Sequence, residues 1–113
     1  MVCKNISITR GDSKTLILKV KDGNSTISDF DKVYFSVKKD CFTEDLILQK
    51  KLNSGITKNE TTYEILIDAS DTDNLEYGRY EYDIEVIKGS LKETVLGGVF
   101  TIEKEVTFVS NEV

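Results

Sequence analysis

Three acidic residues, Glu81, Asp83 and Glu85, are the side chains whose types and spacing come nearest to catalytic chemistry. Two carboxylates can serve as general acid and base when they flank a pocket. These three alternate with Tyr82 and Ile84, so an extended strand carries them on one solvated face, about 7 Å apart. Carboxylates in such a row do not flank a substrate, and we expect no catalytic pair among them.

A second group of acidic residues consists of Asp68, Asp71, Asp73 and Glu76. Calcium takes several converging oxygen ligands, but this spacing lacks the glycine and the distal glutamate of a calcium loop. Ser70 followed by Asp73 resembles a helix capping box. We therefore predict one short helical turn near residues 70–75 and no metal site.

Histidine is absent, and the cysteines are Cys3 and Cys41. This composition disfavours a four-ligand zinc site and removes histidine as the base of a nucleophile. Gly97-Gly98 alone is not a phosphate loop, and nothing beside Cys41 guarantees a lowered thiol pKa. We predict that the chain is not an enzyme, with no cofactor and with no catalytic, cofactor-binding or metal-ligating residue.

Two further motifs have ordinary explanations. Arg10-Gly-Asp12 matches a tripeptide that integrins bind, but Gly-Asp between two strands is common turn chemistry. Three Asn-x-Ser/Thr sequences also occur. The opening residues lack a basic segment followed by an apolar one. We therefore expect synthesis in a reducing cytoplasm, free thiols, and no glycosylation at these asparagines.

Net charge is −5, which disfavours general binding to nucleic acid or anionic lipid. No apolar run approaches the ~18 residues of a membrane helix, so we predict no membrane partner. The charge is uneven: residues 1–58 sum to +4 and residues 59–113 to −9. One interpretation is that basic strands pair with acidic ones inside a sheet. The other is that two oppositely charged faces drive head-to-tail assembly.

The candidate residues discussed above are expected to lie on or between β-strands. The 113 residues match one domain, 1–113, with a core over about 6–108. Residues 80–87 alternate strictly between apolar and charged side chains, the pattern of a strand with one buried face. The other expected strands cover 6–8, 16–20, 32–38, 46–52, 62–67, 92–96 and, after an interruption at Gly97-Gly98, Phe100 toward Phe108.

Seven or eight strands joined by short turns predict an all-β, antiparallel sandwich. The helical turn just before the strand at 80–87 favours an immunoglobulin-like arrangement. In such a domain Tyr80 occupies the position of a tyrosine corner, its hydroxyl bonded to upstream backbone. We expect Asp73, Leu75 and Gly78 to form a local plug with Tyr80.

Surface contacts can also be predicted. If strand 32–38 lies beside strand 80–87, Lys32 and Lys38 can pair with the acidic row. The strand near Ile6 and the long final strand are the expected sheet edges, and exposed edges pair readily with neighbours. Among the tyrosines, Tyr34 and Tyr63 are expected to pack across strands.

Several phrases in this order resemble a known family. They are Ile8-Thr-Arg-Gly-Asp12, Leu16-Ile-Leu-Lys-Val20, Val33-Tyr-Phe-Ser-Val-Lys-Lys39, Leu46-Ile-Leu-Gln-Lys50, Tyr80-Glu-Tyr-Asp-Ile-Glu-Val86 and Gly98-Val-Phe-Thr-Ile102 with Val106-Thr107. Together they resemble the immunoglobulin-like domains of bacteriophage and prophage structural proteins, in particular the N-terminal domain of upper baseplate and tail-associated proteins.

That resemblance implies a non-enzymatic structural protein of the virion tail or baseplate, made in the cytoplasm of the bacterial host. Its expected partners are other tail and baseplate proteins, or further copies of itself through edge strands. It could be a stand-alone tail component or one domain of a longer protein. The alternative is a carbohydrate-binding or adhesion sandwich, which needs exposed aromatic side chains, with Tyr34, Tyr63 and Tyr77 as candidates.

Overall fold

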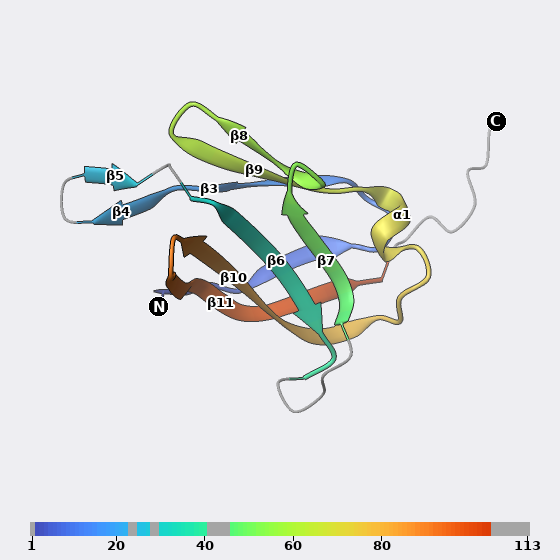
Figure 1. Ribbon diagram of the computed structural model, residues 1–113. Coiled ribbons are helices and arrows are strands. Elements are labelled where there is room, and N and C mark those ends of the chain that lie inside the picture. Colours follow the sequence, from blue (N-terminus) through green and yellow to red (C-terminus); the bar gives the residue numbers. More distant parts are fainter. Residues whose placement is uncertain (1, 23–24, 28–29, 41–45, 105–113) are drawn as a thin grey trace.

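Alternating apolar and polar side chains produce a fold made almost entirely of strands (Figure 1). The computed structural model describes residues 2–22, 25–27, 30–40 and 46–104. Its elements are β1 (Val2–Cys3), β2 (Ile6–Thr9), β3 (Lys14–Leu18), β4 (Val20–Asp22), β5 (Ser25–Ile27), β6 (Lys32–Lys38), β7 (Leu46–Leu52), β8 (Gly55–Asn59), β9 (Thr62–Ile67), α1 (Ala69–Thr72), β10 (Gly78–Lys88) and β11 (Leu91–Glu103).

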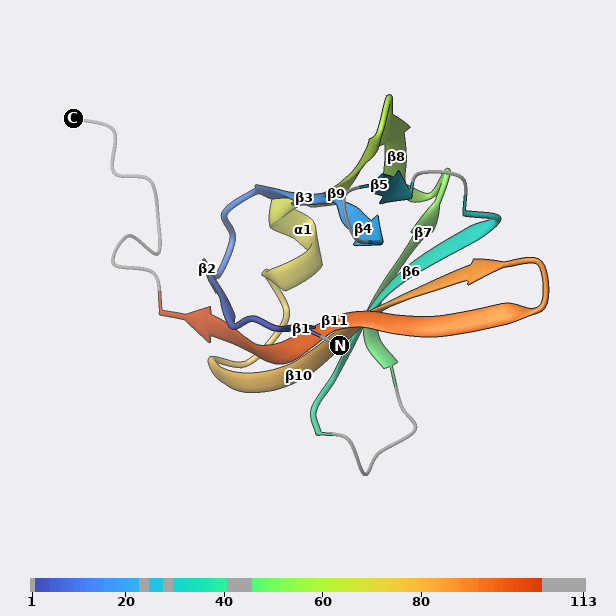
Figure 2. The same ribbon diagram turned by 90° about the vertical axis from the view of Figure 1, so that its left-hand side faces the viewer.

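The strands form two layers. Hydrogen bonding follows the order β1-β11-β10-β6-β7-β8-β9-β3, with β2 also paired to β11. The path turns over between β7 and β8, where Lys51 pairs with Gly55 and Leu52 with Ile56. In Figure 2, β3 and β9 lie above β10 and β11, with α1 between them at one end. Strands β4 and β5 form a separate hairpin.

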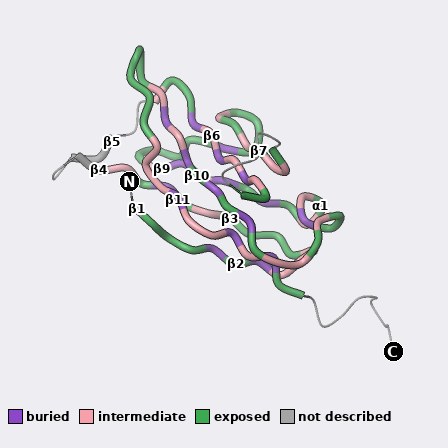
Figure 3. The backbone as a smooth tube through the Cα atoms, turned by 90° about the horizontal axis from the view of Figure 1, so that it is seen from below, coloured by how far each residue is buried: buried purple, intermediate pink, exposed green. Residues whose placement is uncertain are grey.

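The core lies between the layers. Along β10, buried and exposed residues alternate, as the sequence predicted, with Tyr80, Tyr82, Ile84 and Val86 no more than 4% exposed. Buried positions also recur along β6 and β11 (Figure 3). Their aromatic rings cluster: the Phe35 ring centroid is 5.6 Å from that of Tyr82 and 6.1 Å from that of Phe100. Such rings bury the largest apolar areas in a small core.

The fold is an immunoglobulin-like β-sandwich, as predicted. Most strand pairs are antiparallel, and the N-terminal strand β2 runs parallel to β11 along the edge of the larger layer. Tyr80 forms the expected corner: its hydroxyl donates to the backbone carbonyl of Glu76 at 2.7 Å. This bond ties the start of β10 to the segment that follows α1.

The helix is present, but its cap differs from the prediction. The N-cap residue is Asp68, and its N–H donates to Oδ2 of Asp71 at 2.7 Å. The expected pair, Ser70 and Asp73, is wrong by two residues. Asp68 has the extended backbone of an N-cap, with φ −81° and ψ 158°, whereas Ser70 is already inside the helix.

The final strand also differs from the prediction in two ways. β11 continues through Gly97-Gly98, and its bulge lies at Val95, because Ile84 pairs with Leu96 but Glu85 pairs with Thr94. Nor is β11 an edge strand, since β10 flanks it on one side and β1 and β2 on the other. The expected edge near Ile6 is confirmed. The predictions at Val106 and Phe108 lie outside the described residues.

Three strands have no counterpart among the predicted ranges, β1, β5 and β8, and β4 overlaps the predicted strand 16–20 only at Val20. In the described part of the chain, β3 pairs on one side only, with β9, and β7 pairs along Leu46–Lys50 only with β6. These two strands therefore provide the open edges, in addition to β1 and β2. Cys41 lies outside the described residues, and Cys3 is an exposed free thiol.

Candidate functional site

The acidic row predicted on β10 lies on the outer face of the larger layer. Strand register arranges this outer face in three rows across β11, β10, β6 and β7. The rows are Val99–Glu81–Lys38–Leu46, Gly97–Asp83–Ser36–Gln49, and Thr94–Glu85–Tyr34–Lys51. We use "outer face" below for these twelve residues. The outer face juxtaposes the acidic residues of β10 with Lys38 on the neighbouring strand β6 and Lys51 on the next strand, β7.

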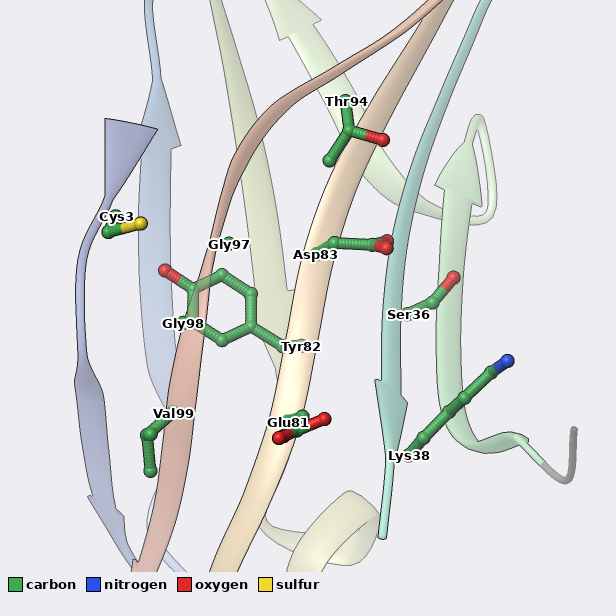
Figure 4. A pocket seen from close by; sticks show the side chains of 10 residues that line it. All are labelled: Cys3, Ser36, Lys38, Glu81, Tyr82, Asp83, Thr94, Gly97, Gly98 and Val99. Carbon is green, nitrogen blue, oxygen red and sulfur yellow. The ribbon is translucent and has the colours of Figure 1, made fainter. Parts of the chain in front are cut away.

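A shallow hollow opens in this face over β11 and β10 (Figure 4). Its volume is about 450 Å³, and its lining includes Glu81, Asp83, Thr94 and Val99. Figure 4 shows Asp83 and Ser36 side by side on neighbouring strands. Gly97 lies beside Asp83 without a side chain, so the face is lower there than at its flanking rows.

The glycine pair has a structural reason. Lys4 lies alongside β11: its N–H donates to the Gly97 carbonyl at 2.9 Å, and its own carbonyl accepts from the Tyr82 hydroxyl. A Cβ atom on Gly98 would lie 2.5 Å from the Lys4 carbonyl oxygen. Glycine therefore permits the N-terminal segment to pack against β11.

Electrostatics on the outer face is mixed. Partial burial raises the pKa of Asp83, the Glu85 carboxylate raises it further, and the Lys38 ammonium lowers it. Glu85 forms an ion pair with Lys92 at 3.6 Å. On β6 and β7, Nε2 of Gln49 donates to Oγ of Ser36 at 3.2 Å. The side chains in this face can bind charged or polar groups.

The predicted lysine contacts are half correct. Lys38 lies directly opposite Glu81, which confirms the pairing of a basic strand with the acidic one. Lys32 lies opposite Ile87, so its assignment to the acidic row was wrong. The strand continues past Glu85 with the apolar Ile87, as in the predicted range 80–87, so Lys32 faces an apolar residue there.

The other acidic group acts within the scaffold. Asp71 Oδ2 pairs with Lys50 Nζ at 2.8 Å and also accepts from the Asp68 N–H. Among the described residues, no three histidine, cysteine or acidic side chains are grouped so that they could hold a metal ion. Capping and ion pairing thus account for Asp71 without a ligand.

The Arg10-Gly-Asp12 tripeptide packs against the α1 region. The Arg10 guanidinium lies over the Tyr77 ring, 4.3 Å from its centroid. Gly11 N–H donates to the Thr72 hydroxyl at 2.9 Å, and Gly11 has a φ of 84°. These contacts give the tripeptide a structural role at the junction of β2, β3 and α1.

The candidate aromatic patch does not assemble. Tyr63 is 1% exposed, and its hydroxyl accepts from the Phe30 N–H at 3.1 Å. This burial confirms that Tyr63 packs in the core and removes it as a surface residue. Tyr34 is half-buried between Glu85 and Lys51 on the outer face, and Tyr77 packs against Arg10 at the α1 end.

A smaller apolar surface lies on the other layer. Ile17 on β3 is 68% exposed and Leu66 on β9 is 43% exposed. They are diagonal neighbours, since Ile17 pairs with Glu64 and Thr15 with Leu66. Sequence analysis predicted a strand at 16–20, but it did not identify this strand as an open edge. No helix in the described residues is long and apolar enough to span a membrane.

Sequence reasoning also missed most of the outer face. It identified the acidic residues and Lys38, but not Gly97, Ser36 or Gln49 as their neighbours. The Gly-Gly pair inside an alternating strand was the available signal, because glycine there often marks a close approach of two backbones. The row partners could not be found from the sequence because they depend on strand order and register.

Comparisons with known proteins give little further information. No protein-family model and no curated protein matches the chain. One similar chain of known structure comes from work on "multimeric cell-adhesive interactions of VGSC beta subunits". It is 16% identical, covers 93% of each chain and has a TM-score of 0.41.

Proposed function

We propose that this protein is a non-enzymatic structural module of a phage or prophage tail or baseplate, made in the bacterial cytoplasm and assembled through protein–protein contacts. The ordered phrases described above support the phage assignment. The described polar clusters support a scaffold role, since Asp71 caps a helix and pairs with Lys50. The acidic row on β10 faces lysine and serine instead of a second catalytic group.

The open edge of β3 is the observation that carries this proposal. Five residues, Lys14–Leu18, pair with β9 on one side only among the described strands. Ile17 extends from this edge with 68% of its surface exposed. An edge of this kind can add a strand from another protein, with backbone hydrogen bonds supplying affinity and an apolar side chain supplying specificity.

The carbohydrate-binding alternative is less well supported. It requires aromatic rings gathered on one exposed patch, whereas Tyr63 is buried and Tyr77 packs on Arg10. Tyr34 is the remaining candidate on the outer face, and it is flanked by Glu85 and Lys51. A glycan array would revive this alternative if the purified protein bound a defined sugar.

Mass spectrometry of gradient-purified particles from a strain that carries the gene tests the proposal. The wild-type chain should sediment with tail particles. Ile17→Lys should reduce incorporation, because a charge on the edge opposes strand addition. Leu91→Lys is the matched control, since Leu91 is 74% exposed at the β10–β11 turn, away from β3. Absence of the wild-type chain from particles would contradict the proposal.

A further inference from the structure

We propose that the outer face binds the outer face of a second copy of this chain, related by a twofold axis that runs parallel to the strands between β10 and β6. The inference extends the proposed assembly role by identifying one partner. It rests on the three rows set by strand register. A twofold interface requires a surface that is complementary to itself.

The axis follows from the arrangement of the rows. Rotation about a line between β10 and β6 places β10 of one copy over β6 of the other, and β11 over β7. Positions along the strands are unchanged, so each row meets its own counterpart in reverse order. Any property that differs in sign across the line between β10 and β6 therefore becomes complementary between the copies.

Charge changes sign across the line between β10 and β6. Glu81 on β10 lies opposite Lys38 on β6, so in the dimer Glu81 of each copy lies over Lys38 of the other. Lys51 on β7 lies over Thr94 of the other copy, next to Glu85. The four central charges then alternate in sign, which favours this register and opposes a shift by one strand.

Shape follows the same operation. The central row runs from Gly97 to Gln49, so the exposed Gln49 side chain of one copy lies over the glycine hollow of the other. In the neighbouring row, Leu46, which is 45% exposed, lies over half-buried Val99. An exposed polar residue thus meets a hollow of about 450 Å³, and an exposed apolar residue meets another apolar one.

The central row also supplies a hydrogen-bond donor for the Asp83 carboxylate. Asp83 lies over Ser36 of the second copy, whose hydroxyl can donate a hydrogen bond to it. Asp83 lines the hollow, where a second copy would displace its water. A hydroxyl donor from the second copy compensates for the solvent that the interface displaces.

The size of the face predicts a weak dimer. Four strands about 4.8 Å apart and three rows about 7 Å apart cover roughly 300–400 Å² per copy, compared with roughly 800 Å² per partner in stable complexes. Twisted sheets also cross at about 30°, so contact is best in the central row. We expect association that depends on protein concentration and weakens with salt, and that becomes effective where an assembly holds copies close together.

Charge reversal tests this inference on the purified chain. One variant carries Glu81→Lys and Glu85→Lys, and the other carries Lys38→Glu and Lys51→Glu. Each should associate with itself about tenfold or more weakly than wild type, because like charges meet. An equimolar mixture of the two should regain association, and so should the variant that carries all four changes. Sedimentation velocity up to about 1 mM protein measures these equilibria.

Cross-linking is an independent measurement that does not depend on charge. In a Cys3→Ser, Cys41→Ser background, a chain with Gln49→Cys mixed with a chain with Gly97→Cys should form a disulfide under mild oxidation. A chain with Lys58→Cys replaces the first chain as the control, because Lys58 lies on β8, away from the outer face. Circular dichroism verifies the fold of every variant.

The outcomes separate this inference from the proposed function. The twofold interface would be overturned if the wild-type chain remained monomeric up to about 1 mM. It would also be overturned if the Glu81→Lys, Glu85→Lys variant and the Lys38→Glu, Lys51→Glu variant each associated as strongly as wild type. Neither result would affect incorporation into particles through the β3 edge. Conversely, a dimer that responds to charge as described, in a protein absent from tail particles, would retain the interface and contradict the phage assignment.

Discussion

Tyr80→Phe tests the corner that identifies this sandwich. The substitution removes one hydroxyl and keeps the ring, which is 4% exposed. That hydroxyl donates to the Glu76 carbonyl at 2.7 Å and closes the segment between α1 and β10. A net intramolecular hydrogen bond contributes about 0.5–1.5 kcal/mol to stability. Glu76 is exposed, so its carbonyl can bond to water after the change.

We therefore expect Tyr80→Phe to lower the free energy of unfolding by about 1 kcal/mol. In a domain of this size the melting temperature should fall by roughly 4 °C. Urea unfolding followed by circular dichroism measures the difference, and the slope with urea should not change. Tyr34→Phe on the outer face is the matched control, and its effect should remain within about 0.5 kcal/mol.

A loss below about 0.3 kcal/mol for Tyr80→Phe would refute the structural role of the corner, since the hydroxyl would then gain nothing over water. A second readout is available from the phenol itself. Burial raises the pKa of Tyr80, and the Glu76 carboxylate raises it further, while the backbone hydrogen bond lowers it. In the folded protein, ultraviolet titration should show ionisation of this tyrosine above the ordinary value of 10.0.

Three further changes test other parts of the structure. Gly98→Ala should destabilise by about 1–3 kcal/mol, because its Cβ would lie 2.5 Å from the Lys4 carbonyl. Gly89→Ala, in open space at φ 61°, is its control for backbone strain, and thermal melts compare the two. Phe35→Ala should cost about 3–5 kcal/mol in urea unfolding, since Phe35 is fully buried. Asp83→Asn should raise the melting temperature at pH 7, because burial and Glu85 raise the Asp83 pKa. The folded state then holds that proton more tightly than the unfolded chain. Stability from this group is therefore present below the ordinary pKa of 3.8 and lost as pH rises through the folded value, and Asp83→Asn should remove this loss.

Local pattern explains what could be predicted from the sequence. Strict alternation from Tyr80 to Ile87 identified both the strand and its buried face, and the spacing from the helical turn to Tyr80 identified the corner. Both depend on neighbours within a few residues. The same reasoning placed β6, β7 and β9 at 32–38, 46–52 and 62–67, as observed.

Long-range pairing explains what was missed. β1 has two residues and β8 carries a single buried side chain, Ile56, so neither shows alternation. The edges were misjudged because the parallel pairing of β2 with β11 depends on contacts between the two ends of the chain. Gly97-Gly98 was interpreted as an interruption, because the sequence does not reveal that the Lys4 backbone packs there.

Assembly of particles in a gene-deletion strain is the most direct test of the proposed assembly role. Complementation with Leu91→Lys, which places a charge at the exposed β10–β11 turn away from β3, should restore the number of complete tails counted by electron microscopy. Ile17→Lys at the open β3 edge should fail to restore it. Normal numbers of complete tails with Ile17→Lys would contradict the account.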